Sequence, residues 1–339
     1  MRASQIHENM PSYLGLDVGG ANLKAAHTSG VASLLPFELW KKPDGLVEAL
    51  RGLFAIMPPF DALAVTMTGE LCDCFATKRE GVQFILDAVA SAAANRPIHV
   101  WRTDGRFVSV AEARATPLQT AAANWLALAT YAGRFAPQGP AVLIDIGSTT
   151  TDIVPLVDGK PAPRGRPDPD RLRCGELVYT GVRRTPLCAL LGGGAAAELF
   201  ATTLDVCLIL EALPEDPSDR ATADGRPATR AAAHARLARM LCADAETCTP
   251  AETRKLAERV LQKQMYLLTF ALGQVSERLP GLQTVILAGS GEFLARTALA
   301  EQEHFPLSKI VSLTEQLGPE ISQAACAYAL AVLASEQSP

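Results

Sequence analysis

Two short turns rich in glycine and hydroxyl side chains contain the residue types that could bind phosphate. The first lies in the segment 14–24 (LGLDVGGANLK), and the second lies in 142–153 (VLIDIGSTTTDI). In each, a buried-strand pattern carries an aspartate, Asp17 or Asp145, to the point where the chain turns. Glycine lets backbone N–H groups approach an anion, and an aspartate can hold Mg²⁺ beside it. One such turn reads equally well as a hairpin loop. Two copies predict a phosphate-binding cleft.

The residues of these turns are the predicted ligands of Mg²⁺ and of the phosphates. Asp17 and Asp145 are expected to hold Mg²⁺ directly or through water, because each occurs at the same place in a repeated motif. Backbone N–H groups and short polar side chains are expected to bind the phosphate oxygens. These are the groups of Gly19, Gly20, Asn22, Gly147, Ser148, Thr149 and Thr150.

Three ionisable side chains close to the turns are the candidates for catalysis. Lys24 follows the first turn on the next strand, where its ammonium group would stabilise a departing diphosphate. Asp152 follows three threonines at the rim of the second turn and is the first candidate for a general base. Glu70, at the end of the strand-like segment 61–71, is the second. Each has a simpler interpretation, since Asp152 could cap a turn and a glutamate at a strand end is usually solvated.

The composition excludes several classes of protein. A length of 339 residues with 48% hydrophobic residues indicates about two domains with proper cores. The net charge of −5 argues against a broad nucleic-acid surface. The first ten residues lack an apolar signal-peptide core, and the longest apolar stretches are too short to span a bilayer. We therefore expect a cytoplasmic protein without a membrane partner, and a homo-oligomer is compatible with these data.

The cysteine and histidine spacings argue against a metal centre of the zinc type. None of the eight cysteines forms a CxxC pair, and none of the five histidines forms an HxxxH pair. Reduced thiols in a cytosolic protein are the simpler explanation.

The periodicity along the chain predicts an α/β protein built from two related halves. Before the second turn, the chain is expected to run through a strand, a turn, a strand, a helix, a strand and a helix. At the second turn, the same order of a strand followed by a turn begins again. A third glycine motif ends a buried strand in the segment 284–293 (TVILAGSGEF). The Pro-rich stretch 158–186 is expected to be an irregular, functional excursion. Helices are expected from Asp44 and over 81–93, 120–131, 252–274 and 323–334.

Five segments, taken in order, resemble the recurring motifs of the actin, sugar-kinase and chaperone ATPase superfamily. They are the two turns, the alanine-rich helix 120–131, the third glycine motif and the C-terminal helix. The resemblance implies two ribonuclease-H-like domains with phosphates bound in the cleft between them. It implies one domain at 1–118 with 321–339 and another at 119–320, with an inserted subdomain at about 185–250. In an ATP-using relative, Gly289, Ser290 and Gly291 would cradle the nucleoside.

Further motifs resemble a narrower family. The second turn is similar to that of the hydantoinase/oxoprolinase branch, and the segments 65–82, 175–186 and 222–240 resemble tetrahydromethanopterin-linked one-carbon-transfer pathway proteins. Archaeal members include a methanofuran-pathway enzyme that joins an aminomethylfuran-methyl diphosphate to the phenol of γ-glutamyl-tyramine and releases diphosphate. The resemblance implies a transferase of this kind, using Mg²⁺ and these two small molecules, for which ATP is not favoured. A tyrosine analogue of the acceptor stays open.

Tyr179, Arg183 and Arg184 are the candidates for contacting the carboxylates or the aromatic ring of such an acceptor. A tight turn with solvent-facing arginines is an equal alternative.

Two other functions remain as alternatives. The third glycine motif favours an ATP-dependent enzyme, either a small-molecule kinase or a hydrolase of the oxoprolinase/hydantoinase type. The second alternative is a nucleotide-sensing or scaffold protein without turnover. The presence of Asp17, Asp145 and Asp152 argues against it, because these are the carboxylates that turnover would use.

Overall fold

Two sheets with the same topology form the centre of the molecule. The computed structural model describes residues 11–300 and 309–337, so the first ten residues discussed above lie outside it. Strand order is β3-β2-β1-β4-β5-β6 in the first sheet and β10-β8-β7-β11-β12 in the second. In each sheet, the first three strands of this order pair with one another in antiparallel fashion. The next two strands extend the sheet through parallel pairing. The predicted α/β fold with two ribonuclease-H-like halves is therefore confirmed.

The central strands are continuous apolar runs because both of their faces are covered. All residues of β1 and β4 are buried. The first sheet consists of β1 (Tyr13–Val18), β2 (Asn22–His27), β3 (Ala32–Pro36), β4 (Ala62–Met67), β5 (Ile98–Trp101) and β6 (Phe107–Val108). The second consists of β7 (Pro140–Ile146), β8 (Thr151–Val157), β10 (Leu177–Val178), β11 (Thr284–Ala288) and β12 (Lys309–Ser312), and β9 (Lys160–Pro161) pairs with β8.

The helices divide between the two halves and an insert. Before the second turn they are α1 (Leu46–Ile56), α2 (Lys78–Ala92), α3 (Val110–Ala115), α4 (Pro117–Thr120) and α5 (Asn124–Ala132), with 3₁₀ turns at η1 (Pro43–Gly45), η2 (Gly69–Leu71) and η3 (Gly133–Phe135). After it they are α6 (Asp168–Arg173), α7 (Leu187–Leu191), α8 (Thr203–Ile209), α9 (Arg230–Met240), α10 (Pro250–Ser276), α11 (Glu292–Ala300), α12 (Leu313–Leu317), α13 (Pro319–Gln323) and α14 (Ala325–Gln337). No helix in the described ranges has the length and hydropathy to cross a membrane.

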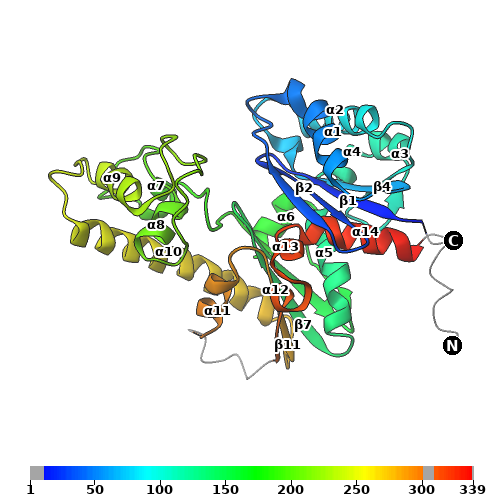
Figure 1. Ribbon diagram of the computed structural model, residues 1–339. Coiled ribbons are helices and arrows are strands. Elements are labelled where there is room, and N and C mark those ends of the chain that lie inside the picture. Colours follow the sequence, from blue (N-terminus) through cyan, green and yellow to red (C-terminus); the bar gives the residue numbers. More distant parts are fainter. Residues whose placement is uncertain (1–10, 301–308, 338–339) are drawn as a thin grey trace, which may run out of the picture.

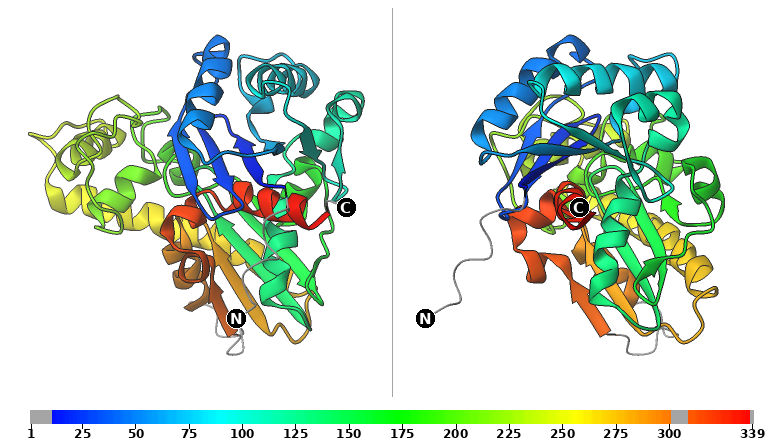
Figure 2. Two further views of the ribbon diagram at one scale, coloured as in Figure 1. Left: turned by 45° about the vertical axis from the view of Figure 1, so that its right-hand side comes forward. Right: turned by 90° about the vertical axis from the view of Figure 1, so that its right-hand side faces the viewer.

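Helices α5 and α14 form a layer between the two sheets (Figures 1 and 2). Their small apolar side chains belong to one buried cluster that also takes Ala64 from the first sheet and Leu143 from the second. The outer face of the first sheet is covered by α1 and α2, and that of the second by α10 and α11. We propose that the two domains meet at this layer, with the boundaries expected above.

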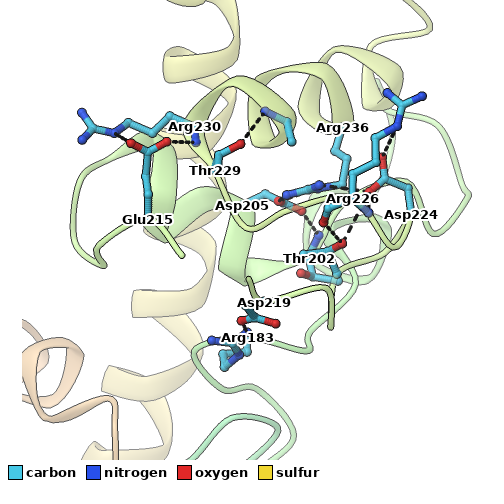
Figure 3. A network of polar contacts seen from close by, with 12 residues as sticks. Arg183, Thr202, Asp205, Glu215, Asp219, Asp224, Arg226, Thr229, Arg230 and Arg236 are labelled. Carbon is cyan, nitrogen blue, oxygen red and sulfur yellow. Dashed lines mark hydrogen bonds and ion pairs between the residues drawn. The ribbon is translucent and has the colours of Figure 1, made fainter. Parts of the chain in front are cut away.

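Helices α7, α8 and α9 form an insert that projects from the second half (Figure 1). The N-terminal part of α10 completes its apolar core through Leu256 and Val260. A buried arginine, Arg236, donates to Asp205 at 2.7 Å and to Asp224 at 3.0 Å (Figure 3). Because this guanidinium is fully buried, its charge needs both carboxylates.

Several predicted helix boundaries are wrong. The expected single helix at 120–131 is split, since α4 ends at Thr120 and α5 begins at Asn124. Ala122 between them has a φ of 49°, and the Thr120 hydroxyl donates to the Ala113 and Thr116 carbonyls. Local packing overrides alanine's helix propensity here. Helix α10 begins earlier than expected, at Pro250, because Thr249 and Glu252 form a capping box.

Candidate active site

The two predicted phosphate turns are built in the same way. The Gly19 N–H donates to the Asn22 carbonyl at 3.0 Å, and the Gly147 N–H donates to the Thr150 carbonyl at 2.9 Å. Each therefore closes a tight hairpin between two antiparallel strands.

The same register pairs an aspartate with a second charged residue in each hairpin. Asp17 of β1 lies opposite Lys24 of β2, and Asp145 of β7 lies opposite Asp152 of β8. Lys24 and Asp152 thus occupy equivalent positions, with opposite charge.

The charges of Asp17, Lys24 and Asp145 act on one another. Burial raises the pKa of Asp17, and Lys24 opposes that rise. Burial and the charge of Asp152 raise the pKa of Asp145 to about 7. Burial works against the Lys24 ammonium, but nearby acidic groups, led by Asp17 and followed by Cys326 and Asp145, outweigh it and raise the pKa of Lys24. The structure therefore brings these three predicted residues together.

The polar atoms at the turns include groups without a protein partner. The buried Oδ1 of Asp17 has no hydrogen-bond partner among the residues described. Ser148 and Thr149 are half-buried, and their hydroxyls are 3.4 Å apart. Within the described ranges, no three His, Cys, Asp or Glu side chains lie close enough together to hold a metal ion.

Asp152 is committed to a buried ion pair. Its Oδ1 lies 2.8 Å from the Arg171 guanidinium, which is 1% exposed and stacks 3.9 Å from the centre of the Trp125 ring. Burial raises the pKa of Asp152, and Arg171 opposes the rise. Sequence reasoning missed Arg171, which lies on α6 within the stretch expected to be irregular. The spacing of nineteen positions between Asp152 and Arg171 carries no local signal.

Glu70 is buried, so its interpretation as a solvated carboxylate is wrong. It lies in η2 with 1% of its surface exposed, because α2 packs on its backbone. A Cβ on Gly81 of α2 would lie 2.3 Å from the Glu70 carbonyl oxygen. The Glu70 Oε2 has no hydrogen-bond partner in the described part of the chain. Burial raises the pKa of Glu70 to about 7, opposed by Lys78.

Polar contacts connect the first half of the molecule with the second. The Lys78 Nζ of α2 lies 3.5 Å from the Asp168 carboxylate of α6. The Arg166 guanidinium donates to the Thr103 carbonyl at 2.6 Å. These pairs are far apart in sequence, and only the fold brings them together.

A segment after β10 lies directly on the second turn. The Val182 N–H donates to the Gly147 carbonyl at 3.0 Å, and the Arg184 N–H donates to the Ser148 carbonyl at 2.9 Å. Gly181 permits this close approach because it has no side chain. Gln264 of α10 holds the segment through hydrogen bonds to the Thr180 hydroxyl at 3.0 Å and the Gly181 carbonyl at 2.9 Å. Helix α10 therefore braces the turn through this segment.

Replacing Gly181 by alanine is expected to lower turnover by about ten-fold, because the added methyl group displaces the second turn. Its Cβ would lie 2.6 Å from backbone atoms of Gly147, Ser148 and Thr149. Steady-state kinetics and thermal melting would measure the effect. Gly193→Ala is the matched control, since nothing lies within 4 Å of its Cβ position. Equal turnover in the two variants would contradict the bracing role.

The third glycine motif also packs against the second turn. Gly289 has a φ of +81°, and a Cβ there would lie 2.4 Å from the Asp145 Oδ1. The Gly291 N–H donates to the Ile146 carbonyl at 2.9 Å. Ser290 between them is exposed. The third glycine motif thus lies directly on the second turn.

The three predicted acceptor contacts have different surroundings. Tyr179 is 62% exposed. Arg183 forms an ion pair with Asp219 of the insert (Figure 3). The Arg184 guanidinium lies 4.5 Å from the centre of the Trp40 ring, which belongs to the first half.

A pocket of about 470 Å³ lies elsewhere, beside α6 and α10. It contains none of the predicted site residues. The pocket is lined by Arg164, Asp170, Arg173, Cys174, Gln274, Glu277 and Arg278.

Comparisons with known proteins identify the family of the chain. The model of the hydantoinase/oxoprolinase family matches residues 61–337. A (4-{4-[2-(γ-L-glutamylamino)ethyl]phenoxymethyl}furan-2-yl)methanamine synthase of Methanocaldococcus jannaschii is 34% identical over 96% of this chain and 98% of its own. The synthase of the same name from Methanococcus vannielii is 32% identical over 57% of this chain and 89% of its own. Both curated relatives are thus biosynthetic enzymes.

A solved structure shows the same fold. Nucleotide-free acetone carboxylase aligns with 95% of this chain and 70% of its own at 11% identity and a TM-score of 0.54. The match of the family model to most of the chain, together with the first curated relative, establishes the family. The chain belongs to the hydantoinase/oxoprolinase family. It is homologous to the methanamine synthases of the two archaea named above.

Proposed function

We propose that this protein is a transferase of methanofuran biosynthesis. It would condense an aminomethylfuran-methyl diphosphate with the phenol of γ-glutamyl-tyramine, or of its tyrosine analogue, and release diphosphate. The observation that carries the proposal is the identity of 34% over 96% of the chain to a synthase whose product contains a phenoxymethyl-furan ether. The paired turns support it, because such a reaction needs a site for a diphosphate leaving group.

In the proposed reaction the phenol oxygen forms a bond to the furfuryl carbon while the bond from that carbon to the diphosphate oxygen breaks. The bond electrons leave with the diphosphate, and the phenol proton goes to a base. Backbone N–H groups of the turns would bind the phosphate oxygens, and the Lys24 ammonium would stabilise the charge that develops on the leaving group. Asp17 and Asp145 increase that ammonium's pKa, so it stays charged.

The carboxylates of the turns fit a Mg²⁺ ion. Protein sites for Mg²⁺ commonly use one or two carboxylates and complete the coordination with substrate phosphates. The Asp17 Oδ1, which lacks a hydrogen-bond partner in the part of the chain that the structure describes, and the carboxyl of Asp145 match that donor set. When bound, Mg²⁺ would neutralise charge on the diphosphate.

Glu70 is the better base candidate in this proposal, ahead of Asp152. Asp152 is held by Arg171 in a buried ion pair, and removing its charge would leave that guanidinium uncompensated. The Glu70 Oε2 has no hydrogen-bond partner among the described residues, and burial raises the pKa of Glu70 to about 7, which suits a base working near neutral pH.

Replacing Glu70 by glutamine is expected to lower kcat by about a hundred-fold or more. The base must be ionised, so wild-type turnover should rise with pH through about 7. That rise should disappear in the variant. A pH–rate profile of both proteins measures this. An unchanged profile with full activity would exclude Glu70 as the base.

The same variant has an expected effect on stability. Glu70 has a folded-state pKa above its usual 4.5, so the folded protein holds this proton more tightly than the unfolded chain does. Its stabilising contribution is therefore present below about pH 4.5 and is lost as pH rises to about 7. Glu70→Gln should be more stable than the wild type at pH 8, by up to about 3 kcal/mol, with little difference at pH 4. Urea unfolding at both pH values measures it.

An assay without ATP tests the proposed reaction. Purified protein is incubated with Mg²⁺, the aminomethylfuran-methyl diphosphate and γ-glutamyl-tyramine, and the ether and diphosphate are measured by mass spectrometry. The tyrosine analogue is run in parallel. Formation of both products supports the transferase. If no ether forms and phosphate release requires ATP, the alternative is correct, namely a kinase or an oxoprolinase/hydantoinase-type hydrolase. The observation that favours that alternative is that Gly289, from the motif that would cradle a nucleoside, packs against Asp145 of the second turn.

A further inference from the structure

Trp40 and Arg184 form a contact between the two halves of the molecule beside the phosphate-binding turns. The guanidinium lies 4.5 Å from the centre of the indole ring. Trp40 follows β3 of the first sheet, and Arg184 follows β10 of the second. Their contact therefore connects the two halves of the molecule.

Each of the two residues is tied through the backbone to one of the turns. The N–H of Leu39, next to Trp40, donates to the Gly20 carbonyl at 2.9 Å. The N–H of Arg184 donates to the Ser148 carbonyl at the same distance. The distance between the two turns therefore sets the position of the Trp40 ring relative to the Arg184 guanidinium.

The Arg184 guanidinium has the properties of an anion ligand. Its side chain is exposed, and it forms no ion pair with any carboxylate that the structure describes, whereas Arg183 is paired with Asp219. A guanidinium that stacks by its face keeps its N–H donors free, because they point outward in its plane. The protein therefore holds this cation in place without neutralising it.

The charge of Arg184 also reaches the first turn. Burial is the main cause that raises the pKa of Cys72 to about 11, and the Arg184 charge opposes that rise. Cys72 abuts the turn, since a Cβ on Gly20 would lie 2.7 Å from its Sγ. Arg184 is therefore anchored on the second turn and acts electrostatically on the first.

We propose that Arg184 binds the diphosphate group held between the two turns, and that Trp40 is the positioning residue that keeps the guanidinium there. The diphosphate would receive backbone N–H groups from both turns and charged donors from this arginine. The choice of a diphosphate as the anion rests on the proposed function. The placement of the cation rests on the contacts above.

Binding of Mg²⁺ and inorganic diphosphate to the full-length protein tests the proposal by calorimetry. The Kd of Arg184→Gln is expected to rise by about ten-fold or more, because charge-assisted hydrogen bonds are lost. Lys41→Gln is the matched control. Lys41 also lies near Trp40, 5.9 Å from the ring centre, but it is already paired with Glu38. Its Kd should stay within about two-fold of the wild type.

The Trp40 variants test the positioning role. Trp40→Phe keeps an aromatic face and should bind diphosphate nearly as the wild type does, whereas Trp40→Leu should bind more weakly. In the wild type, bound diphosphate should also reduce acrylamide quenching of tryptophan fluorescence. Trp101 and Trp125 are 1% and 2% exposed, so this signal reports Trp40. Circular dichroism confirms that each variant is folded.

Four results would overturn the inference. They are unchanged binding in Arg184→Gln, an equal loss in Lys41→Gln, equal binding in Trp40→Phe and Trp40→Leu, and no diphosphate binding by the wild type. Failure of the proposed function is distinguishable, since a wild type that binds diphosphate but forms no ether refutes only the transferase. An Arg184→Gln variant with an unchanged KM for the diphosphate substrate refutes only this inference.

Discussion

Replacing Asp145 by asparagine is expected to lower the rate of the proposed ether formation by about a thousand-fold, while the protein stays folded. The carboxylate lies at the end of β7, opposite Asp152 and close enough to Lys24 to interact with its charge. Its pKa of about 7 shows that the folded protein holds the ionised form at a cost. Asparagine removes that charge with little change of shape. Stability should therefore stay equal or rise as activity is lost.

The ether assay and thermal melting together measure this prediction. Asp87→Asn is the control, because Asp87 is an exposed residue of α2 that pairs with Arg114. It should keep full activity. Retention of more than about a tenth of wild-type turnover in Asp145→Asn would show that Asp145 has no essential role in the reaction.

Replacing Gly15 by valine is expected to destabilise the fold by about 3 kcal/mol or more. Gly15 lies in the middle of β1, where α14 packs directly on the strand. A Cβ at Gly15 would lie 1.8 Å from the Ala327 carbonyl oxygen and 2.9 Å from the Ala331 nitrogen. Both are backbone atoms of a buried helix, so they can move away only if α14 moves. The melting temperature should fall by roughly 5–10 °C.

Gly52→Ala provides the contrasting measurement. Gly52 lies on the exposed side of α1, and nothing lies within 4 Å of its Cβ position. Alanine is the better helix former, so this variant should be more stable by about 0.5–1 kcal/mol. If Gly15→Val melted at the wild-type temperature, the close packing of α14 on β1 would be refuted.

The strands and turns of the site could be predicted because their signals are local. Asp17 and Asp145 each end an apolar run and precede a glycine-containing turn, and the structure places both in matching hairpins. The repeated order of elements likewise indicated two related halves. The helix expected at 120–131 is where local propensity failed, because packing around Ala122 decided the break.

The surroundings of the candidate bases could not be predicted, because they depend on distant residues. Glu70 follows an apolar strand in sequence, but α2 covers it and raises its pKa to about 7. Asp152 is paired with Arg171 from a stretch whose composition suggested irregular structure. Burial and ion pairing depend on the whole fold, since both are set by groups that meet only after the chain has folded.

The sequence by itself determined the two turns, their aspartates and the α/β class, because these follow from hydrophobic periodicity and glycine chemistry within a few residues. Only the tertiary structure decided that Asp152 pairs with Arg171, that α2 buries Glu70, and that Arg184 contacts Trp40. The physical reason is that these contacts join groups distant in sequence, and they depend on how the helices pack on the sheets and how the two halves approach each other. No short segment encodes either of these.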